Sequence, residues 1–147
     1  MNFLTLLKQE HKEAKDTFKT LLNQEKIDHA ITEELCHKLL LHMEMEEKYL
    51  YPTMEEFKAT EDLSEEAELE HTEAKKFITA LLNGKLDEME YKVKLEMLQL
   101  GVEHHIEEEE NKLFPIAKTK LSDAQVKEIS EQMIALKEKK SKTVAVK

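Results

Sequence analysis

The sequence is poor in residues that break helices. Its 147 residues include two Gly and two Pro, and Trp is absent. An all-β fold needs turn residues about every ten positions, so this composition excludes one. Charged residues make up 37% and hydrophobic residues 40%, and 27 of the 32 acids are Glu. Such a composition favours long amphipathic helices.

Arginine is also missing, and all 22 basic residues are lysine. The formal net charge of −10 leaves no basic face to neutralise phosphates, which argues against nucleic-acid binding. The single cysteine, Cys36, cannot form an intramolecular disulfide and fits a reducing compartment. No apolar run approaches about 18 residues and no N-terminal signal pattern occurs, so we expect a cytoplasmic protein with no membrane partner.

Apolar residues recur three and four positions apart in four segments, which predicts four long helices. Ser64 is expected to cap the start of the third helix, and Asn83-Gly84 is expected to end it. Asp87 is expected to cap the start of the fourth helix. Pro52 predicts a kink or stop in the second helix, and the fourth is expected to close at Pro115. The four segments run over about residues 2–23, 29–52, 64–83 and 87–115.

The chain contains an internal repeat. Glu10–Asn23 matches Glu70–Asn83 at a shift of 60, with eight of 14 residues identical. His42–Pro52 matches His105–Pro115 at a shift of 63, with six of 11 identical. The chain therefore consists of two similar helix pairs.

Short loops between helices of this length predict an all-α, up-down-up-down four-helix bundle. We expect the bundle over residues 1–118, with its two repeats over about 1–60 and 61–118. A capping box at Ser122 predicts an additional C-terminal helix. That helix and a lysine-rich tail, expected to fray from Lys137, occupy residues 119–147 of the same domain.

Four of the seven histidines lie on the apolar faces of the expected helices, one per helix. They are His11, His42, His71 and His105. Glu46 and Glu109 follow two of them after four residues, so each glutamate lies one turn from its histidine on the same face. The repeat pairs His42 with His105. The neighbouring His104 and Glu108 then point about 100° away from the apolar face that carries His105 and Glu109.

Two glutamates and four histidines in a bundle core need compensation, because each buried unpaired charge costs several kcal/mol. A pair of divalent metal ions provides it, and this donor set suits iron, as well as manganese or zinc. Carboxylates on facing helices can bridge both metals and leave open coordination positions for a small molecule. A repeat kept only for packing would not explain ionisable residues on these faces.

The remaining polar residues receive simpler interpretations. His29, His37 and His104 are expected at the surface. Glu47 and Glu110 are candidate partners of the ligand residues. Tyr49 and Tyr51 are interpreted as packing residues, with a redox role as the alternative, and Cys36 as a small buried hydrophobe. Gly101 either leaves room for a ligand or allows close helix packing.

At these residues the sequence resembles the hemerythrin-like family, also called the HHE cation-binding domain. The resemblance covers about residues 3–118. It implies two iron ions, rather than Mn or Zn, in a non-haem centre with oxo or hydroxo and carboxylate bridges, whose exchangeable position binds O2, NO or peroxide. The residues that match the family motif are His11, His42, Glu46, His71, His105 and Glu109.

The match to oxygen-carrying hemerythrins is incomplete. Those proteins have a His-x3-His pair on the third helix, whereas Ala67 and Lys75 lie one turn on either side of His71 here. Their fourth-helix acid is an Asp five residues after its histidine, whereas Glu109 follows His105 after four. The set is closer to the iron-sulfur-cluster repair proteins and other bacterial HHE domains. Lys75 is then either a hydrogen-bond donor or a side chain that extends to solvent.

Three functions follow from these patterns. The first is a di-iron protein, more a binding protein than an enzyme, that binds or senses O2, NO or peroxide. The second is iron-sulfur-cluster repair, iron donation, or peroxidase or NO-reductase-like activity at the same centre. The third is a metal-free interaction module whose fifth helix docks a partner or self-associates. A ferritin-like site is disfavoured because its Glu-x2-His spacing occurs only as Glu68 to His71, with Glu68 off the apolar face.

Overall fold

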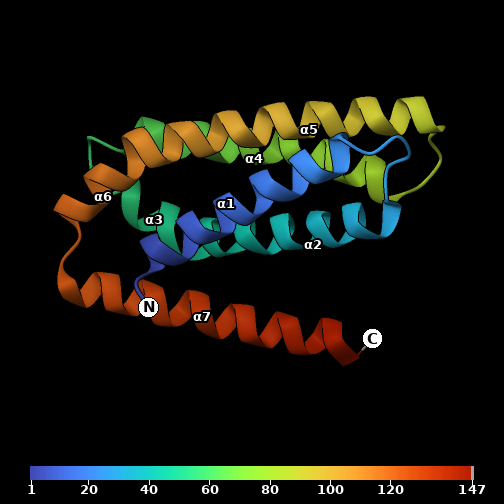
Figure 1. Cartoon of the computed structure of the whole chain (residues 1–147). Helices are drawn as coiled ribbons and strands as arrows, with labels where there is room; N and C mark the ends of the chain where they lie inside the picture. The colour runs from blue at the N-terminus through green and yellow to red at the C-terminus, as the bar shows by residue number, and fades with distance from the viewer. Residues whose placement is uncertain (147) are drawn as a thin grey trace.

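The structure, a computed structural model, describes the backbone of residues 1–146 and the side chains of residues 1–140. Within this part every regular element is a helix (Figure 1). The bundle consists of four long helices, α1 (Phe3–Leu22), α2 (His29–Met45), α4 (Glu61–Leu82) and α5 (Glu88–Glu108). The predicted all-α bundle is confirmed.

The four long helices form two packed pairs. Helix α4 packs along α5, helix α1 contacts α2 and α5, and α2 also contacts α4. The apolar core is divided into two clusters. One contains Phe18, Leu35 and Leu95 near the α1–α2 and α4–α5 loops, and the other contains Phe3 and Leu113 at the opposite end. The polar residues predicted on the apolar faces lie between these two clusters.

Side-chain caps fix the starts of α2 and α5, of which the cap at Asp87 was predicted and the cap at Asp28 was not. Asp28 accepts a hydrogen bond from the Ile31 N–H, and Asp87 forms a capping box with Glu90. Gly84 takes the left-handed conformation that ends α4, with φ 65°. This conformation is accessible to glycine at no steric cost.

The prediction that Ser64 caps the third helix is wrong. Helix α4 begins at Glu61, one turn earlier, and Glu61 and Asp62 occupy its first turn. Ser64 is fully buried inside the helix, and its hydroxyl donates a hydrogen bond to the Thr60 carbonyl at 2.8 Å. A serine inside a helix commonly bonds back one turn in this way when its hydroxyl cannot reach solvent.

The prediction that the fourth helix closes at Pro115 is wrong. Each proline follows a π-helical turn, η1 (Glu46–Leu50) or η2 (Glu109–Leu113), and lies in the first turn of the next helix. A proline is tolerated there because its missing N–H is not needed. The chain continues as the short helix α3 (Tyr51–Met54) in one repeat and α6 (Phe114–Lys120) in the other.

The additional C-terminal helix is α7 (Asp123–Val146), which contacts α1, α2 and η1. The predicted capping box is present, since the Gln125 N–H donates to the Ser122 hydroxyl oxygen at 3.1 Å and the Ser122 N–H donates to Gln125 Oε1 at 3.0 Å. Fraying from Lys137 is wrong for residues 137–140, because Lys137 pairs with Glu10 at 2.7 Å and the helix continues. The side chains of residues 141–147 lie outside the described part.

In the part of the chain that the structure describes, no helix is both long enough and apolar enough to cross a membrane.

Candidate metal centre

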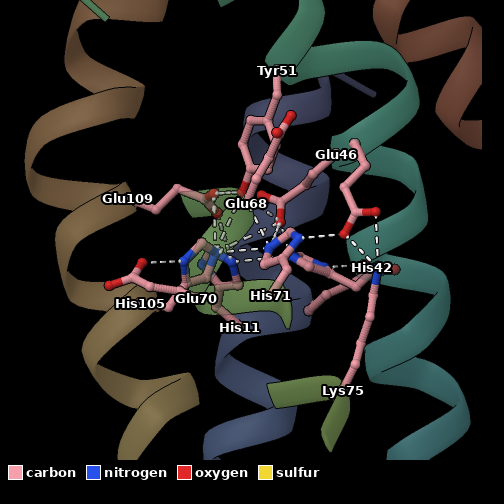
Figure 2. A network of polar contacts seen from close by, with 12 residues as sticks. His11, His42, Glu46, Tyr51, Glu68, Glu70, His71, Lys75, His105 and Glu109 are labelled. Atoms are coloured by element: carbon pink, nitrogen blue, oxygen red, sulfur yellow. Dashed lines mark hydrogen bonds and ion pairs between the residues drawn. The ribbon is translucent and has the colours of Figure 1, made fainter. Parts of the chain in front are cut away.

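The structure brings all six predicted ligand residues into one buried layer of the bundle (Figure 2). None of these residues is more than 8% exposed. Each long helix supplies one histidine, and each π-helical turn begins with one of the two glutamates. The six residues are His11, His42, Glu46, His71, His105 and Glu109.

The four imidazoles form two pairs. The Nε2 atoms of His11 and His42 lie 3.1 Å apart, and those of His71 and His105 lie 3.2 Å apart. The first pair joins helices α1 and α2, and the second pair joins α4 and α5. The two pairs therefore define two half-sites.

Both glutamates lie between the half-sites. Glu109 Oε1 is 3.3 Å from His11 Nε2, whereas Glu109 Oε2 is 3.2 Å from His105 Nε2. Glu46 Oε1 is 3.4 Å from His42 Nε2 and 3.2 Å from His71 Nε2. Each carboxylate thus faces one histidine from each pair.

Two observations fit this donor set to bound metal. Glu46 Oε2 and Glu109 Oε1 are buried and accept no hydrogen bond, which is costly unless a cation is present. In addition, bonds of about 2.1 Å to a tetrahedral metal place neighbouring ligand atoms about 3.4 Å apart. The spacings of 3.1–3.4 Å within the half-sites are close to that value.

Outer carboxylates hold all four imidazoles in place. The predicted partners are both present, because His11 Nδ1 contacts Glu110 at 2.7 Å and His71 Nδ1 contacts Glu47 at 2.8 Å. A carboxylate on Nδ1 places the proton there and leaves Nε2 free to face the half-site. Lys75 is the hydrogen-bond donor that the sequence allowed, since its Nζ lies 2.9 Å from both Glu47 oxygens.

The other two outer carboxylates were missed from the sequence. His42 Nδ1 contacts Glu10 at 2.7 Å, and His105 Nδ1 contacts Glu70 at 2.8 Å. The signal for them was the Glu-His dipeptide that begins each repeat. In each dipeptide the histidine faces inward, and the glutamate before it holds a histidine on another helix.

The interpretation of Tyr51 as a packing residue was incomplete. Tyr51 is fully buried, and its hydroxyl donates to Glu109 at 2.5 Å and lies 3.2 Å from Glu46 (Figure 2). Burial and the two nearby carboxylates raise the pKa of Tyr51 well above its usual value. Its repeat counterpart, Phe114, lacks the hydroxyl and stacks on His11, with ring centroids 5.8 Å apart.

The π-helical turns begin at the glutamates and place the aromatic residues that follow them. The Tyr51 N–H bonds to the Glu46 carbonyl and the Phe114 N–H to the Glu109 carbonyl, five residues back in each case. A π-helical turn contains more residues than an α-helical turn, so it changes the direction of the side chains that follow. Glu46 comes before this change, because its own N–H bonds to the His42 carbonyl as in an α-helix, and it faces the half-sites while the adjacent Glu47 reaches His71.

The buried carboxylates favour the protonated form of the neighbouring imidazoles. Burial opposes protonation of His42, but Glu46 and Glu10 outweigh it and raise the His42 pKa to about 10. Burial likewise acts against the charge of Glu46, yet the surrounding histidines hold its pKa well below the usual value. Metal ligands must lose their protons, so a cation that binds here displaces protons from the imidazoles.

A cavity of about 510 Å³ adjoins the four imidazoles. Its walls combine apolar side chains such as Leu35 and Val102 with charged residues, including Lys137. Gly101 lies on its lining, and a Cβ at this position would meet nothing within 4 Å. Close helix packing at Gly101 is therefore wrong, and room for a ligand beside it stays a prediction.

The remaining histidines agree with the sequence prediction. His29, His37 and His104 are exposed. Cys36 is fully buried, as predicted.

Comparisons with known proteins agree with this geometry. The family model described as the hemerythrin HHE cation binding domain matches residues 2–117. A crystal structure of a hemerythrin HHE cation binding domain-containing protein from Mycobacterium kansasii is 24% identical in sequence, with a TM-score of 0.80. That match covers 99% of this chain and 91% of the other. No curated protein matches. The family model covers most of the chain, which therefore belongs to the hemerythrin HHE cation-binding domain family.

Proposed function

We propose that this protein holds two iron ions in a carboxylate-bridged centre and binds or senses a small ligand, O2, NO or peroxide, at that centre. The ligands are the six buried residues, with His11 and His42 in one half-site and His71 and His105 in the other. Iron is preferred over Mn or Zn because the family and the mixed imidazole and carboxylate donors both favour it.

The observation that carries the proposal is the position of Glu109. Its two carboxylate oxygens lie beside histidines of different pairs, at 3.3 Å from His11 Nε2 and 3.2 Å from His105 Nε2. A carboxylate placed between two groups of imidazoles is suited to two cations rather than one. Glu46 makes the same kind of contact with His42 and His71.

When bound, iron supplies Lewis-acid and redox chemistry at positions that the protein leaves open. The chain's own residues do the rest. The outer carboxylates orient the imidazoles, and the two apolar clusters shield the layer from water. The Tyr51 hydroxyl holds a proton between the two bridging carboxylates, and the 510 Å³ cavity admits the ligand.

A second candidate function is turnover of peroxide or NO at the same centre. The buried phenol of Tyr51 favours it, because a phenol in contact with both carboxylates can deliver a proton within the site. Sustained consumption of peroxide or NO by the iron-loaded protein would support this candidate. Stoichiometric binding without consumption would remove it.

Iron reconstitution tests the proposal. We expect about two iron ions per chain, visible absorption from ferric iron, and a change in that absorption on addition of O2 or NO. The double variant His42→Ala/Glu46→Gln should lose both the iron and the colour. The control is His37→Ala, which removes an exposed histidine from the same helix. Colourless, iron-free wild-type protein whose stability is unchanged by metal would contradict the proposal and favour a metal-free interaction module.

A further inference from the structure

A second His-x3-Glu pair lies on the outer face of α5. His104 and Glu108 come one residue before the buried His105 and Glu109. The corresponding residues of the first repeat, at a shift of 63, are Leu41 and Met45. The outer pair is therefore specific to the second repeat, and the buried centre does not use it.

Glu70 completes a three-residue cluster with this pair. His104 Nε2 lies 3.5 Å from Glu70 Oε2 and 3.4 Å from Glu108 Oε1, and the three potential ligand atoms all lie within 4.8 Å of one another. Bonds of about 2.1 Å to a tetrahedral metal would separate such atoms by about 3.4 Å. The carboxylates are only 20% and 21% exposed, whereas the imidazole is 61% exposed. The cluster thus has two positioned oxygens and one accessible nitrogen.

In the first repeat, a lysine contacts the glutamate that corresponds to Glu70. Glu10 is the counterpart of Glu70, and each holds a buried histidine with one oxygen. The other oxygen of Glu10 lies 2.7 Å from the ammonium of Lys137 on α7. Helix α7 contacts α1 and α2, and Figure 1 shows it along α2, on the side of the bundle opposite α5. In the second repeat the corresponding oxygen faces the imidazole of His104 instead of a lysine.

Negative charge is concentrated at this outer cluster. Glu66 lies nearby, and the Glu108 and Glu70 carboxylates raise the pKa of its carboxyl group. Lys112 is 60% exposed and its Nζ is 3.8 Å from Glu108, a weak and solvent-screened contact. A divalent cation would neutralise both carboxylates more effectively than this lysine.

A small cavity touches both the outer cluster and the buried centre. Its volume is about 10 Å³, which is about the space of one water molecule. Its polar lining consists of Glu70, Glu108, His105 and Glu109. Glu70 and Glu108 belong to the outer cluster, whereas His105 and Glu109 belong to the buried centre.

We propose that Glu70, His104 and Glu108 form a separate surface site for a divalent transition-metal ion, and that an ion bound there passes inward to Glu109. One imidazole and two carboxylates favour Fe²⁺, Zn²⁺ or Mn²⁺ over Mg²⁺, which prefers oxygen ligands in an octahedron. Binding at the outer site stands by itself, whereas the transfer step rests on the proposed function of the buried centre.

Zinc binding to the metal-free chain tests the outer site. Equilibrium dialysis should find three Zn²⁺ ions per wild-type chain and two for the variant His104→Ala/Glu108→Gln. The single variant His104→Ala should weaken the outer ion at least tenfold, and the control His37→Ala should still bind three. Equal numbers and affinities for wild type and the outer variants would overturn the site.

The buried-centre variant His42→Ala/Glu46→Gln separates this inference from the proposed function. It should retain one Zn²⁺ ion, which the further change His104→Ala removes. Should the wild type bind only that one Zn²⁺ ion and also take up no iron on reconstitution, the outer site would stand, and both the proposed function and the transfer step would be overturned.

The rate of iron uptake tests the transfer step. Rapid mixing with Fe²⁺ in air should show ferric absorption that rises about tenfold more slowly in His104→Ala/Glu108→Gln than in wild type, to the same final level. Uptake at the wild-type rate would overturn the transfer step. The control His37→Ala should load at the wild-type rate.

Discussion

At the residue scale, the centre is built from adjacent residues with opposite roles. In Glu46-Glu47 and Glu109-Glu110 the first glutamate faces the half-sites and the second holds a histidine of another helix. The Glu-His pair at the start of each repeat has the roles in the reverse order. His11 faces the half-site, whereas Glu10 before it holds His42. Each imidazole is fixed at both nitrogens, which leaves little rotational freedom to lose when metal binds.

The Tyr51 hydroxyl should stabilise the metal-free protein. In Tyr51→Phe the buried oxygens of Glu46 and Glu109 lose their donor, which costs about 1–3 kcal/mol. Urea unfolding in the presence of a chelator measures this loss. The control Tyr49→Phe alters a half-buried neighbour and should change stability by less than about 0.5 kcal/mol. A similar change in both variants would show that the Tyr51 hydrogen bonds contribute no stability.

Cys36 should be unreactive in the folded protein. Burial, assisted by the charge of Glu33, raises the pKa of its thiol to about 12, and only a thiolate reacts with iodoacetamide. Mass spectrometry at pH 8 should show labelling at least a hundredfold slower in buffer than in urea. Because the folded pKa exceeds the unfolded value, the stability from this neutral thiol is complete below about pH 9 and is lost as pH rises toward 12. Rapid labelling in buffer would contradict the burial of Cys36.

At the element scale, the π-helical turns and α7 are the features that extend a plain four-helix bundle. The π-helical turns let two helices continue past Pro52 and Pro115, and they set the direction of Tyr51 and Phe114. Helix α7 packs on the side of the bundle over the second apolar cluster, and its Ser130 hydroxyl accepts a hydrogen bond from the buried Phe3 N–H at 2.8 Å.

Helix α7 should be an integral part of the fold. Met133 is fully buried in the second apolar cluster, so Met133→Ala leaves a cavity and should cost about 2–5 kcal/mol of unfolding free energy. The matched control is Met89→Ala, because Met89 is 78% exposed and its loss should cost less than about 0.5 kcal/mol. Chemical denaturation compares the two. Equal stabilities would mean that α7 packs only loosely on the bundle.

At the scale of the whole molecule, the buried layer separates two apolar clusters with a band of ionisable groups. The formal net charge of −10 is therefore unevenly distributed, with two glutamates inside the bundle and three carboxylates near the outer cluster. Two divalent ions would add about +4 to this charge, less the protons that they displace. Metal binding and stability should therefore be tightly linked.

Metal should raise the melting temperature of the whole bundle. A ligand that binds only the folded state stabilises it by about 2.7 kcal/mol at a free concentration of 100 times Kd. Thermal unfolding with Fe²⁺ under anaerobic conditions, or with Zn²⁺, should show this increase, and the variant His11→Ala/Glu109→Gln should lose most of it. Mg²⁺ at the same concentration is the control and should give no comparable increase. An unchanged melting temperature with every metal would contradict a buried metal centre.

The sequence by itself determined the helices, the internal repeat and the residues on their buried faces, because the 3.6-residue period places His42 and Glu46 on one face whatever the helix packs against. It also determined the C-terminal helix, through the cap at Ser122. The tertiary structure alone decided which carboxylate holds each imidazole, that Tyr51 reaches Glu109, and that His104 meets Glu70. These contacts join different helices, so they depend on the register and angle of packing and on the two π-helical turns, which a local sequence pattern does not specify.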